Sequence, residues 1–261
     1  MGKVELKIDW ATYEAAKYAV EHWHYSRCMP RSKQAKLAVW EDGKFVGVVL
    51  FGLGAGNLTN GKRFGLAECF EVAELMRVAL KEHKSETSRI VAIALKLLRK
   101  QSPGLRLIIS LADPREGHVG GIYQAGNWVY IGTTEDQVRY FDENGKEHHP
   151  RHLHPSGYKN HWGKPVKCLR PADCRKETFP GKHKYLMPLD DEMRKRIEPL
   201  RKPYPKRDKQ AIGSDQEHSG GAAPTVTLQD KRPKQAMTGD QPEQREYNAH
   251  PDAPITKGGA S

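Results

Sequence analysis

The sequence is poor in cysteine and has no long apolar run. Its 261 residues include four cysteines, whose spacing matches neither a zinc ribbon nor a redox pair: Cys28, Cys69, Cys168 and Cys174. A disulfide-stabilised scaffold is therefore not expected, and the cysteines should be reduced thiols. No segment approaches the roughly 18 apolar residues of a membrane span, and the first residues lack an apolar secretory core. We expect a soluble protein of the cytoplasm with no membrane partner.

Aromatic and branched apolar residues are nearly absent from Gln210 onward. Such a segment cannot bury enough apolar surface to fold, so residues 210–261 are predicted to be a disordered tail. Residues 1–210 carry 38 Lys and Arg against 25 Asp and Glu. This basic excess indicates a polyanionic partner such as nucleic acid, although a basic surface can also serve solubility alone.

The order of apolar patterns predicts a mixed α/β (α+β) fold in which helices flank one central sheet. Strands are expected at residues 3–8, 36–40, 44–51, 70–80, 105–112, 128–131 and 137–141, the last of these pairing with the strand before it. Glu41-Asp42-Gly43 predicts a hairpin turn between the second and third strands. Helices are expected after a cap at Asp9, over residues 87–98 with Ser85 or Thr87 as the cap, and over residues 118–125.

The loop before the helix at residues 87–98 has the features of an anion site. A strand, a loop and a capped helix leave backbone N–H groups free beside the positive end of the helix dipole. Ser85, Thr87 and Ser88 are therefore the candidate cofactor-binding residues, for a diphosphate held without a Walker motif. The alternative is that this loop binds nothing, as in most strand–loop–helix units.

Asp113 and Tyr123 follow the buried strand at residues 105–112. Asp113 stands at the carboxyl end of that strand, where open α/β sheets usually bind ligands, and Tyr123 is on the short helix that follows. Both side chains can face one cleft. The alternative is that Asp113 caps its turn and Tyr123 packs against Trp128 in the core.

Residues 146–209 carry 18 Lys and Arg against eight Asp and Glu, together with six histidines. Four aromatic residues between these charges can stack on bases while Lys and Arg meet phosphates: Tyr158, Trp162, Phe179 and Tyr185. We predict a basic extension that contacts DNA, following a catalytic domain at residues 1–145. The alternative is a solvated basic surface or a disordered linker. The C-x5-C spacing of the two cysteines here does not fit a structural zinc site.

The predicted order of elements resembles the GNAT acyltransferase superfamily. The resemblance implies a sheet that splays between its fourth and fifth strands, here residues 70–80 and 105–112, to admit an acyl-CoA. The segment from Leu80 to Ser88 stands where the superfamily has a glycine-rich turn. An acetyltransferase that acts on a protein or a small amine is one functional alternative.

Within that superfamily the chain resembles the Mom family of phage DNA-modification proteins over roughly residues 1–165. Four separated motifs carry the resemblance in one order: His24-Tyr25-Ser26, Glu74-Leu-Met-Arg77, Asp113-Pro114 and Gly120-Gly-Ile-Tyr-Gln-Ala-Gly-Asn-Trp128. The resemblance implies an enzyme, acting in the cytoplasm of a bacterial host, that converts adenine in double-stranded DNA to an N6-carbamoylmethyl derivative and so shields the DNA from restriction. A non-catalytic basic DNA-binding protein with this fold is the other alternative.

By that resemblance, Tyr25, Arg77, Asp113 and Tyr123 correspond to the active-site residues of the family. Adenine N6 is a poor nucleophile, so a carboxylate such as Asp113 suits it as proton acceptor while Arg77 stabilises developing charge. Tyr123 is placed to donate to a leaving group, and Tyr25 to stack on or hydrogen-bond to a flipped-out adenine. The alternatives are an Arg77 that only pairs with Glu74 and a Tyr25 that only covers the edge of the core.

The product restricts the donor. In a carbamoylmethyl adenine N6 is bonded to a CH2 carbon, whereas acetyl transfer would bond it to a carbonyl carbon. Simple acyl transfer from acetyl-CoA or another activated donor is therefore not the whole reaction, and the candidates for the extra chemistry are a glycine-like donor and a redox metal such as iron. The ligand types to test first are His22, His24, Tyr25 and Asp113.

Overall fold

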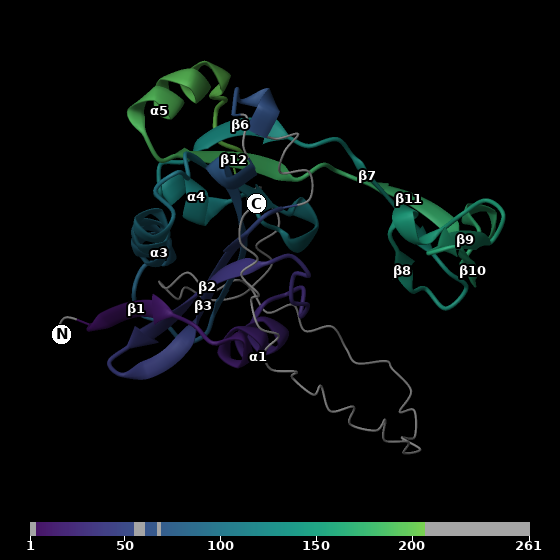
Figure 1. Ribbon diagram of the computed structural model, residues 1–261, viewed down its shortest axis with the longest axis horizontal. Coiled ribbons are helices and arrows are strands. Elements are labelled where there is room, and N and C mark those ends of the chain that lie inside the picture. The colour runs from purple at the N-terminus through teal and green to yellow at the C-terminus, as the bar shows by residue number, and fades with distance from the viewer. Residues whose placement is uncertain (1–3, 55–60, 67–68, 207–261) are drawn as a thin grey trace, which may run out of the picture. The chain divides into compact units, whose positions relative to one another are not determined.

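The computed structural model describes residues 4–54, 61–66 and 69–206. The predicted disordered tail at 210–261 lies outside these ranges. The main elements are β1 (Leu6–Trp10), α1 (Tyr13–Trp23), β2 (Gln34–Glu41), β3 (Lys44–Gly52), η1 (Cys69–Glu71), β4 (Val72–Leu80), α3 (Thr87–Gln101), β5 (Leu107–Ala112), η2 (Pro114–Glu116), α4 (Gly121–Ala125), β6 (Val129–Thr133), β12 (His183–Pro188), α5 (Asp191–Ile197) and η5 (Glu198–Leu200) (Figure 1).

Seven strands form the main sheet, in the order β1-β2-β3-β4-β5-β12-β6. Its neighbours are antiparallel except β4 and β5, which run parallel. These two strands pair only from Val72 opposite Leu107 to Leu75 opposite Ser110. Because β4 continues to Leu80 without β5 beside it, the sheet is split at the carboxyl ends of these strands. The splay predicted from the sequence is confirmed.

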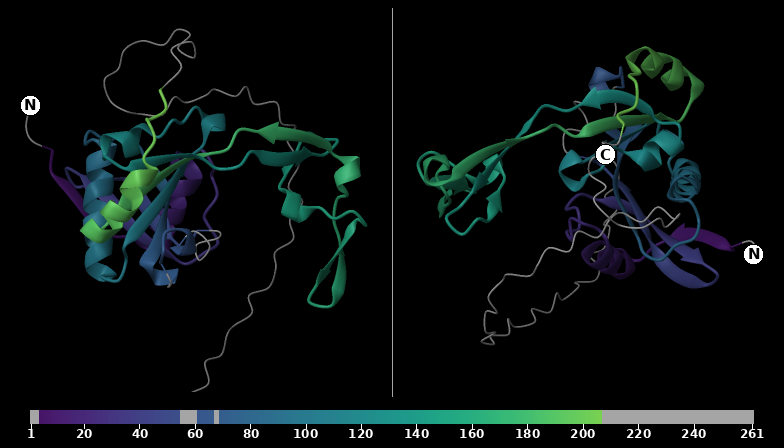
Figure 2. Two further views of the ribbon diagram at one scale, coloured as in Figure 1. Left: turned by 90° about the horizontal axis from the view of Figure 1, so that it is seen from above. Right: turned by 180° about the vertical axis from the view of Figure 1, so that it is seen from behind.

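Helices cover both faces of the sheet, because successive strand residues point to opposite sides. On one face Ala16 and Val20 of α1 pack against Val48 and Leu50 of β3. On the other face, Ile90 and Ala94 of α3 pack against Val49 and Phe51. Met193 and Ile197 of α5 cover Leu107, Ile109 and Leu186. Figure 2 shows these layers from two further directions. Within the described ranges, no helix is long and apolar enough to cross a membrane.

The first helix begins later than the sequence predicted. Asp9 and Trp10 belong to β1, where Asp9 lies opposite Ala38 and Trp10 opposite Leu37 of β2. Thr12 caps α1 instead, its hydroxyl accepting a hydrogen bond from the Ala15 N–H at 3.2 Å. The cap at Asp9 is therefore wrong, because pairing with β2 keeps the chain extended for three residues more. The hairpin turn at Glu41-Asp42-Gly43 is confirmed, with Glu41 opposite Lys44.

The strand at 137–141 does not pair with the strand before it. β6 pairs with β12, and β7 (Gln137–Phe141) pairs with β11 (Arg175–Phe179). The chain runs straight on from β6 into β7, and the Thr134 N–H bonds to the Lys182 carbonyl at 2.9 Å to hold the two chain segments together. This close approach requires Gly181, because a Cβ there would lie 1.9 Å from the Thr134 carbonyl oxygen.

Part of the predicted basic extension lies in the main sheet. β12, although it falls within residues 146–209, pairs along its whole length with β5, from His183 opposite Ala112 to Pro188 opposite Leu107. Tyr185 is consequently fully buried and cannot stack on bases, so that prediction is wrong. Tyr158 and Trp162 are exposed, as that role requires.

Residues 137–179 form a separate group of short elements, called the arm here (Figure 1). A three-stranded sheet has the order β11-β7-β8, and a hairpin pairs β9 with β10. The remaining elements of the arm are β8 (Glu147–His148), η3 (Pro150–His152), β9 (Tyr158–His161), β10 (Lys164–Lys167) and η4 (Pro171–Asp173). The arm thus leaves the main sheet after β6 and returns to it as β12.

Candidate functional site

Polar side chains from four separate segments meet where β4 and β5 part. Tyr25 follows α1, Arg77 is on β4, Asp113 follows β5 and Tyr123 is on α4. The charges of Arg77 and Asp113 both shift the pKa of the Tyr25 phenol, and Tyr25 in turn shifts the pKa of Tyr123. The structure therefore brings the four sequence-predicted residues together. Their catalytic roles stay a prediction.

Asp113 is held from two sides at the end of β5. Its Oδ1 accepts the Arg115 N–H at 3.1 Å, which caps the short helix η2. Its Oδ2 forms an ion pair with Lys182 Nζ at 2.8 Å, and the side chain is mostly buried. The capping alternative for Asp113 is thus observed. The ion pair with Lys182 is a second interaction, which capping does not require. Lys182 was not among the residues predicted from the sequence, because no local pattern connects it to Asp113.

Arg77 sits beside an irregularity in β4. Leu50 of β3 lies opposite Arg77 and Phe51 opposite Leu75, so that Met76 has no partner residue on β3. The Arg77 Nη1 donates to the Met76 carbonyl at 2.7 Å. Its buried Nε has no hydrogen-bond partner among the described residues. An unsatisfied buried donor costs about 1–3 kcal/mol, so a ligand atom that accepted this N–H would recover that cost.

Tyr25 is the accessible member of the cluster, with 47% of the residue exposed. Its ring lies 5.3 Å from His118 and 4.2 Å from His24, measured between centroids. Burial and the nearby Asp113 and Glu116 carboxylates raise the pKa of Tyr25, and the Arg77 charge opposes them. The phenol is therefore neutral at pH 7.

His24 fixes the loop that carries Tyr25. It is buried, and its Nδ1 accepts the Ser26 N–H at 3.1 Å. Burial, with the positive charge of Arg77 and the neighbouring His118, lowers the pKa of His24 to about 3. A neutral histidine thus packs against the Tyr25 ring. Because nearly half of Tyr25 is exposed, a planar ligand can reach its ring.

Tyr123 is buried behind the cluster. Its ring lies 5.1 Å from both Trp128 and Tyr185, so the packing alternative is observed. Burial raises the pKa of Tyr123 to about 12 against the opposing hydrogen bond with Ser110. The phenol stays protonated at physiological pH. Gly120 makes this arrangement possible, since its φ is +79° and a Cβ would lie 2.4 Å from the Tyr185 ring.

Glu74 adds a second carboxyl group to the site. It lies on β4 opposite Ile109, in the short stretch where β4 and β5 are still paired. Burial raises the pKa of Glu74, although the charges of Arg77, Lys182 and Lys184 oppose the shift. A buried carboxyl whose proton affinity is raised is a feature of functional sites. The sequence had indicated Glu74 only as a possible partner of Arg77.

The loop predicted to bind a diphosphate already holds a carboxylate. Glu41 at the end of β2 accepts the Lys84 N–H at 2.6 Å and the Ser85 N–H at 2.7 Å. Burial alone would raise the pKa of Glu41, but these hydrogen bonds outweigh it and lower that pKa. Ser85 or Thr87 as the cap of α3 is wrong, because the N-cap residue is Glu86 and the anion comes from Glu41. Glu41 thus occupies the backbone N–H groups of Lys84 and Ser85, and diphosphate binding by Ser85, Thr87 and Ser88 stays a prediction.

One of the proposed iron ligands, His22, is engaged by its own helix. His22 Nδ1 bonds to the Tyr18 carbonyl at 2.8 Å and its ring stacks on Tyr18, whereas His24 is buried beside Tyr25. Over residues 4–54, 61–66 and 69–206, no group of three or more His, Cys, Asp and Glu side chains could hold a metal ion. The donor set expected for iron is therefore not assembled here.

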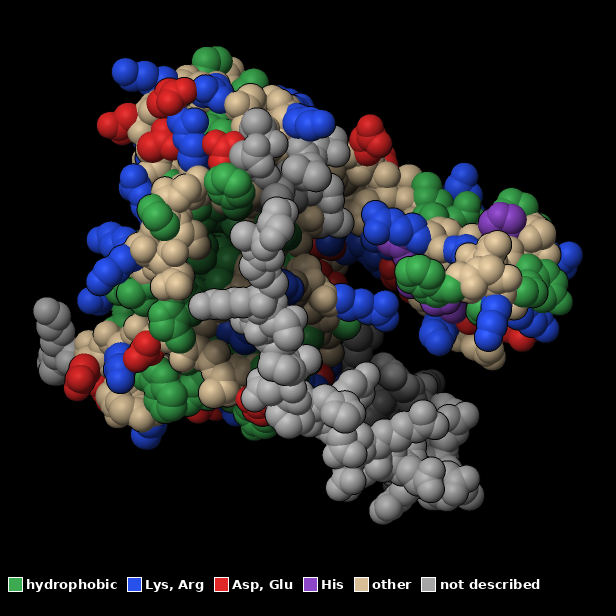
Figure 3. Space-filling view, in the orientation of Figure 1, with side chains coloured by type: hydrophobic (Ala, Val, Ile, Leu, Met, Phe, Trp, Pro, Cys, Tyr) green, Lys and Arg blue, Asp and Glu red, His purple; other side chains and the backbone are tan. Residues whose placement is uncertain are grey.

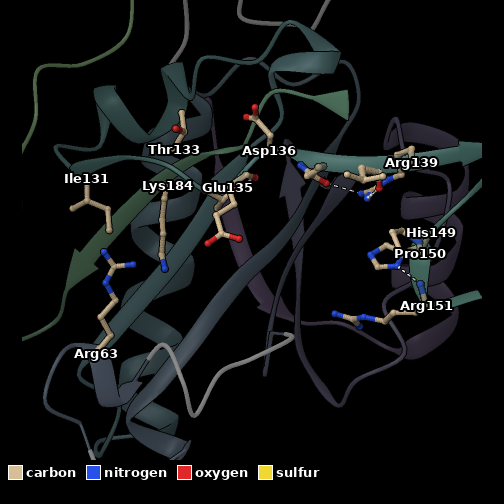
Figure 4. A pocket seen from close by; sticks show the side chains of 13 residues that line it. Arg63, Ile131, Thr133, Glu135, Asp136, Arg139, His149, Pro150, Arg151 and Lys184 are labelled. Carbon is tan, nitrogen blue, oxygen red and sulfur yellow. Dashed lines mark hydrogen bonds between the residues drawn. The ribbon is translucent and has the colours of Figure 1, made fainter. Parts of the chain in front are cut away.

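A cleft of about 670 Å³ lies between the main sheet and the arm. Arg63 and Lys184 extend into it from the main sheet side, and Arg139 and Arg151 line it from the arm (Figure 4). Burial and the nearby Arg63 charge lower the pKa of Lys184. Two carboxylates, Glu135 and Asp136, also line the cleft, so four cations face two anions (Figure 4). This excess of positive charge suits a polyanion, since phosphates gain most from closely spaced Lys and Arg.

Fold and site together define a mixed α/β protein whose polar cluster lies where two parallel strands of the sheet separate. The model of the Mom protein family matches residues 5–206. The chain belongs to the Mom protein family. It is 30% identical over 151 residues to the methylcarbamoylase mom of Escherichia phage Mu, a match that covers 57% of this chain and 61% of that protein. The chain thus matches less than two thirds of that relative's length.

Solved acetyltransferase structures are more distantly similar. The aminoglycoside acetyltransferase AAC(6')-Ib, in complex with coenzyme A and kanamycin, is 10% identical with a TM-score of 0.43, covering 75% of this chain and 98% of that one. A spermidine N-acetyltransferase from Vibrio cholerae, in complex with CoA and spermine, is 9% identical with a TM-score of 0.35, covering 70% and 95%.

Proposed function

We propose that the protein is a DNA-modifying enzyme that adds a carbamoylmethyl group to adenine N6 in double-stranded DNA and so protects it from restriction endonucleases. One observation carries the proposal: Tyr25, Arg77 and Asp113 converge at the split of the sheet in a chain of the Mom family. The name of the phage Mu relative, a methylcarbamoylase, supports the class of product.

Asp113 is proposed to accept the proton that leaves adenine N6. An ionised carboxylate has about four lone-pair positions, of which the Arg115 N–H and Lys182 Nζ occupy two. The others can receive the N6 amine. The ion pair with Lys182 orients the carboxylate before the base arrives. Glu74, whose pKa is raised by burial, is a second carboxyl group of the site that can take up a proton.

Arg77 is proposed to stabilise negative charge that develops on the donor. Its buried Nε lacks a partner among the described residues, so an oxygen of the donor would satisfy it. Such preorganised donors act strongly in a site from which water is excluded. Tyr25 would then stack on the extruded adenine, since its ring is half exposed and uncharged.

Tyr123 is proposed to act through its proton. With a pKa of about 12 it is a hydrogen-bond donor throughout the physiological range. It is too deeply buried to stack on a base, and its reach is limited to a group that enters the split. A leaving group of the donor is the natural acceptor.

The donor has to present a CH2 carbon, rather than a carbonyl carbon, to N6. A glycine-like donor satisfies this condition, whereas acetyl-CoA attacked at its thioester does not. Glu41 also accepts two backbone N–H groups of the loop predicted to bind the CoA diphosphate. The proposed donor therefore carries an activated carboxamidomethyl group.

The cationic cleft and the arm support DNA as the substrate. Arg63, Arg139, Arg151 and Lys184 line one cleft, and phosphate contacts position a duplex without reading its sequence. The test is the mass spectrum of nucleosides from DNA of cells that make the active protein. A deoxyadenosine heavier by the carbamoylmethyl group supports the proposal, and only unmodified deoxyadenosine contradicts it. Acetylated protein or amine in extracts would instead identify an ordinary acetyltransferase.

A further inference from the structure

The β9–β10 hairpin is the most solvent-exposed element of the arm. Its strands pair with His161 opposite Lys164, so that Trp162 and Gly163 form a two-residue turn. Of the strand residues, Lys159 alone is half-buried and the others are exposed. The hairpin lies at the end of the arm that is remote from the main sheet (Figures 1 and 2).

Trp162 is unusual for the tip of such a hairpin. It is 92% exposed, and its φ of +53° is a left-handed conformation that bulky residues seldom adopt. Two-residue turns of this kind favour Asn or Asp before the glycine. Within the described residues its ring contacts His161, at 6.2 Å between centroids. Neither the backbone nor the packing of the chain therefore explains a tryptophan here.

The charge of the hairpin is of one sign. Lys159, Lys164 and Lys167 lie on its two strands, and residues 158–167 contain no Asp or Glu. Lys and Arg side chains also project at several places on the visible face of the arm, among hydrophobic and other side chains (Figure 3). An exposed aromatic ring among lysines is the combination that stacks on bases while phosphates are neutralised. An acidic or apolar protein surface would use the lysines or the ring, but not both.

The root of the arm is tied to the candidate active site. Arg115, two residues after Asp113, donates to Glu147 of the arm at 2.9 Å and lies over the Phe179 ring at 3.8 Å. Arg139 forms an ion pair with the same Glu147 at 2.9 Å. The hairpin is thus presented by a segment that contacts the turn carrying Asp113.

We propose that the β9–β10 hairpin inserts Trp162 against the bases of double-stranded DNA while its lysines contact the neighbouring phosphates. The proposal rests on the proposed function for its partner, DNA. Apolar side chains that enter a base step unstack it and bend the duplex. Trp162 supplies a ring on which the bases of such a step stack, at the end of the arm that is remote from the split of the main sheet (Figure 1).

The test measures binding of the full-length protein to a fluorescently labelled duplex by polarisation. Trp162→Ala should weaken binding by about tenfold, the effect of losing one stacked base, and Trp162→Phe should recover part of it. The matched control is Trp10→Ala, because Trp10 is an exposed tryptophan of β1, 47% accessible. It should bind like the wild type. Equal affinities of Trp162→Ala and Trp10→Ala would overturn the proposal.

The salt dependence separates stacking from charge. Trp162→Ala should keep the slope of log affinity against log salt, whereas replacing Lys159, Lys164 and Lys167 with serine should reduce it. If Trp162→Ala reduces the slope of log affinity against log salt but leaves the affinity unchanged, the tip of the hairpin contributes only charge. That result would overturn the proposal. If the wild type sediments as a dimer and Trp162→Ala as a monomer with unchanged DNA affinity, the hairpin binds a second copy of the chain and the proposal is overturned.

Binding is measured without any modification reaction, so the two proposals fail independently. If binding depends on Trp162 while cellular DNA holds only unmodified deoxyadenosine, the hairpin stands and the enzymatic function fails. If modified deoxyadenosine is found while Trp162→Ala binds like Trp10→Ala, the enzymatic function stands and the hairpin proposal fails.

Discussion

At the scale of single residues, the Asp113–Lys182 ion pair connects the candidate base to the rest of the site. Their 2.8 Å contact joins the end of β5 to the start of β12. A general base must be held in position before its substrate arrives, because a misplacement of about 1 Å can cost two orders of magnitude in rate. Lys182 is therefore a positioning residue in the proposed reaction.

Lys182→Ala should lower the modified fraction of adenine about tenfold or more, because Asp113 loses one of its two anchors. Lys182→Arg should recover most of it, since a guanidinium can pair with the same carboxylate. The measurement is the modified deoxyadenosine per total deoxyadenosine in cellular DNA. Lys81→Ala removes an exposed lysine paired with Glu82 and serves as the control. A Lys182→Ala variant equal to this control would contradict the role.

The candidate site could be predicted from the sequence in part. Asp113 was indicated by its place after a buried strand, and Tyr25, Arg77 and Tyr123 by the family motifs. Lys182 could not be predicted, because it reaches Asp113 only through the insertion of β12 beside β5. Glu41 was likewise read as part of a turn, although its carboxylate binds backbone N–H groups more than forty positions along the chain.

At the scale of elements, Glu41 takes the place of an anionic ligand at the start of α3. Glu41→Gln should lower the free energy of unfolding by about 1–2 kcal/mol, because two charge-assisted hydrogen bonds become neutral or are lost. It should also strengthen the binding of CoA, since a negative charge is removed from the loop that is predicted to bind the diphosphate. Thermal unfolding and calorimetric titration measure the two effects.

The control for this change is Glu82→Gln, an exposed glutamate in the loop before α3. It should alter neither stability nor CoA binding. If Glu41→Gln unfolds like this control, the carboxylate does not hold the helix start. If Glu41→Gln binds CoA no better than the wild type, Glu41 does not exclude the diphosphate.

Asp190 ties α5 to the sheet and makes stability depend on pH. The Arg106 guanidinium, at 2.9 Å, and the Met193 N–H lower the pKa of Asp190 to about 2. Because the folded pKa lies below the unfolded value, this stabilisation is present above about pH 4 and is lost as the pH falls through about 2. It amounts to about 1–2 kcal/mol after allowance for partial exposure.

Asp190→Asn should therefore lower the unfolding temperature at pH 7, and the difference from the wild type should shrink as the pH approaches 2. The amide oxygen can still accept the Met193 N–H, so the loss reports the ion pair with Arg106. Asp191→Asn, one position along in the first turn of α5, is the matched exposed control. A difference that is the same at pH 7 and near pH 2 would contradict the assignment.

Strands and helices were predictable as elements, but some of their partners were not. Apolar periodicity located β2 to β5 and α3 within a few residues. The pairing of β6 with β12 and of β7 with β11 depends on segments separated by the whole arm, and no local pattern specifies it. Helix α1 was placed too early for a similar reason, since the pairing of β1 with β2 keeps Asp9 and Trp10 extended.

At the scale of the whole molecule, the proposed function combines chemistry at the split sheet with a basic surface for DNA. In that proposal the split holds the reactive side chains, the cleft lined by Arg63 and Lys184 binds phosphates, and the arm contacts the duplex. Each of these three roles can be tested separately. Their combination predicts that removing the candidate base abolishes modification without reducing the affinity for DNA.

The most direct measurement is the nucleoside mass spectrum of DNA from cells that make the wild type, Asp113→Asn or Asp9→Asn. Asp9 is an exposed aspartate on β1, paired with Lys7, and is the matched control. We expect modified deoxyadenosine with the wild type and Asp9→Asn, and none with Asp113→Asn at equal protein level and equal duplex affinity. Modified deoxyadenosine at wild-type level with Asp113→Asn would contradict the account.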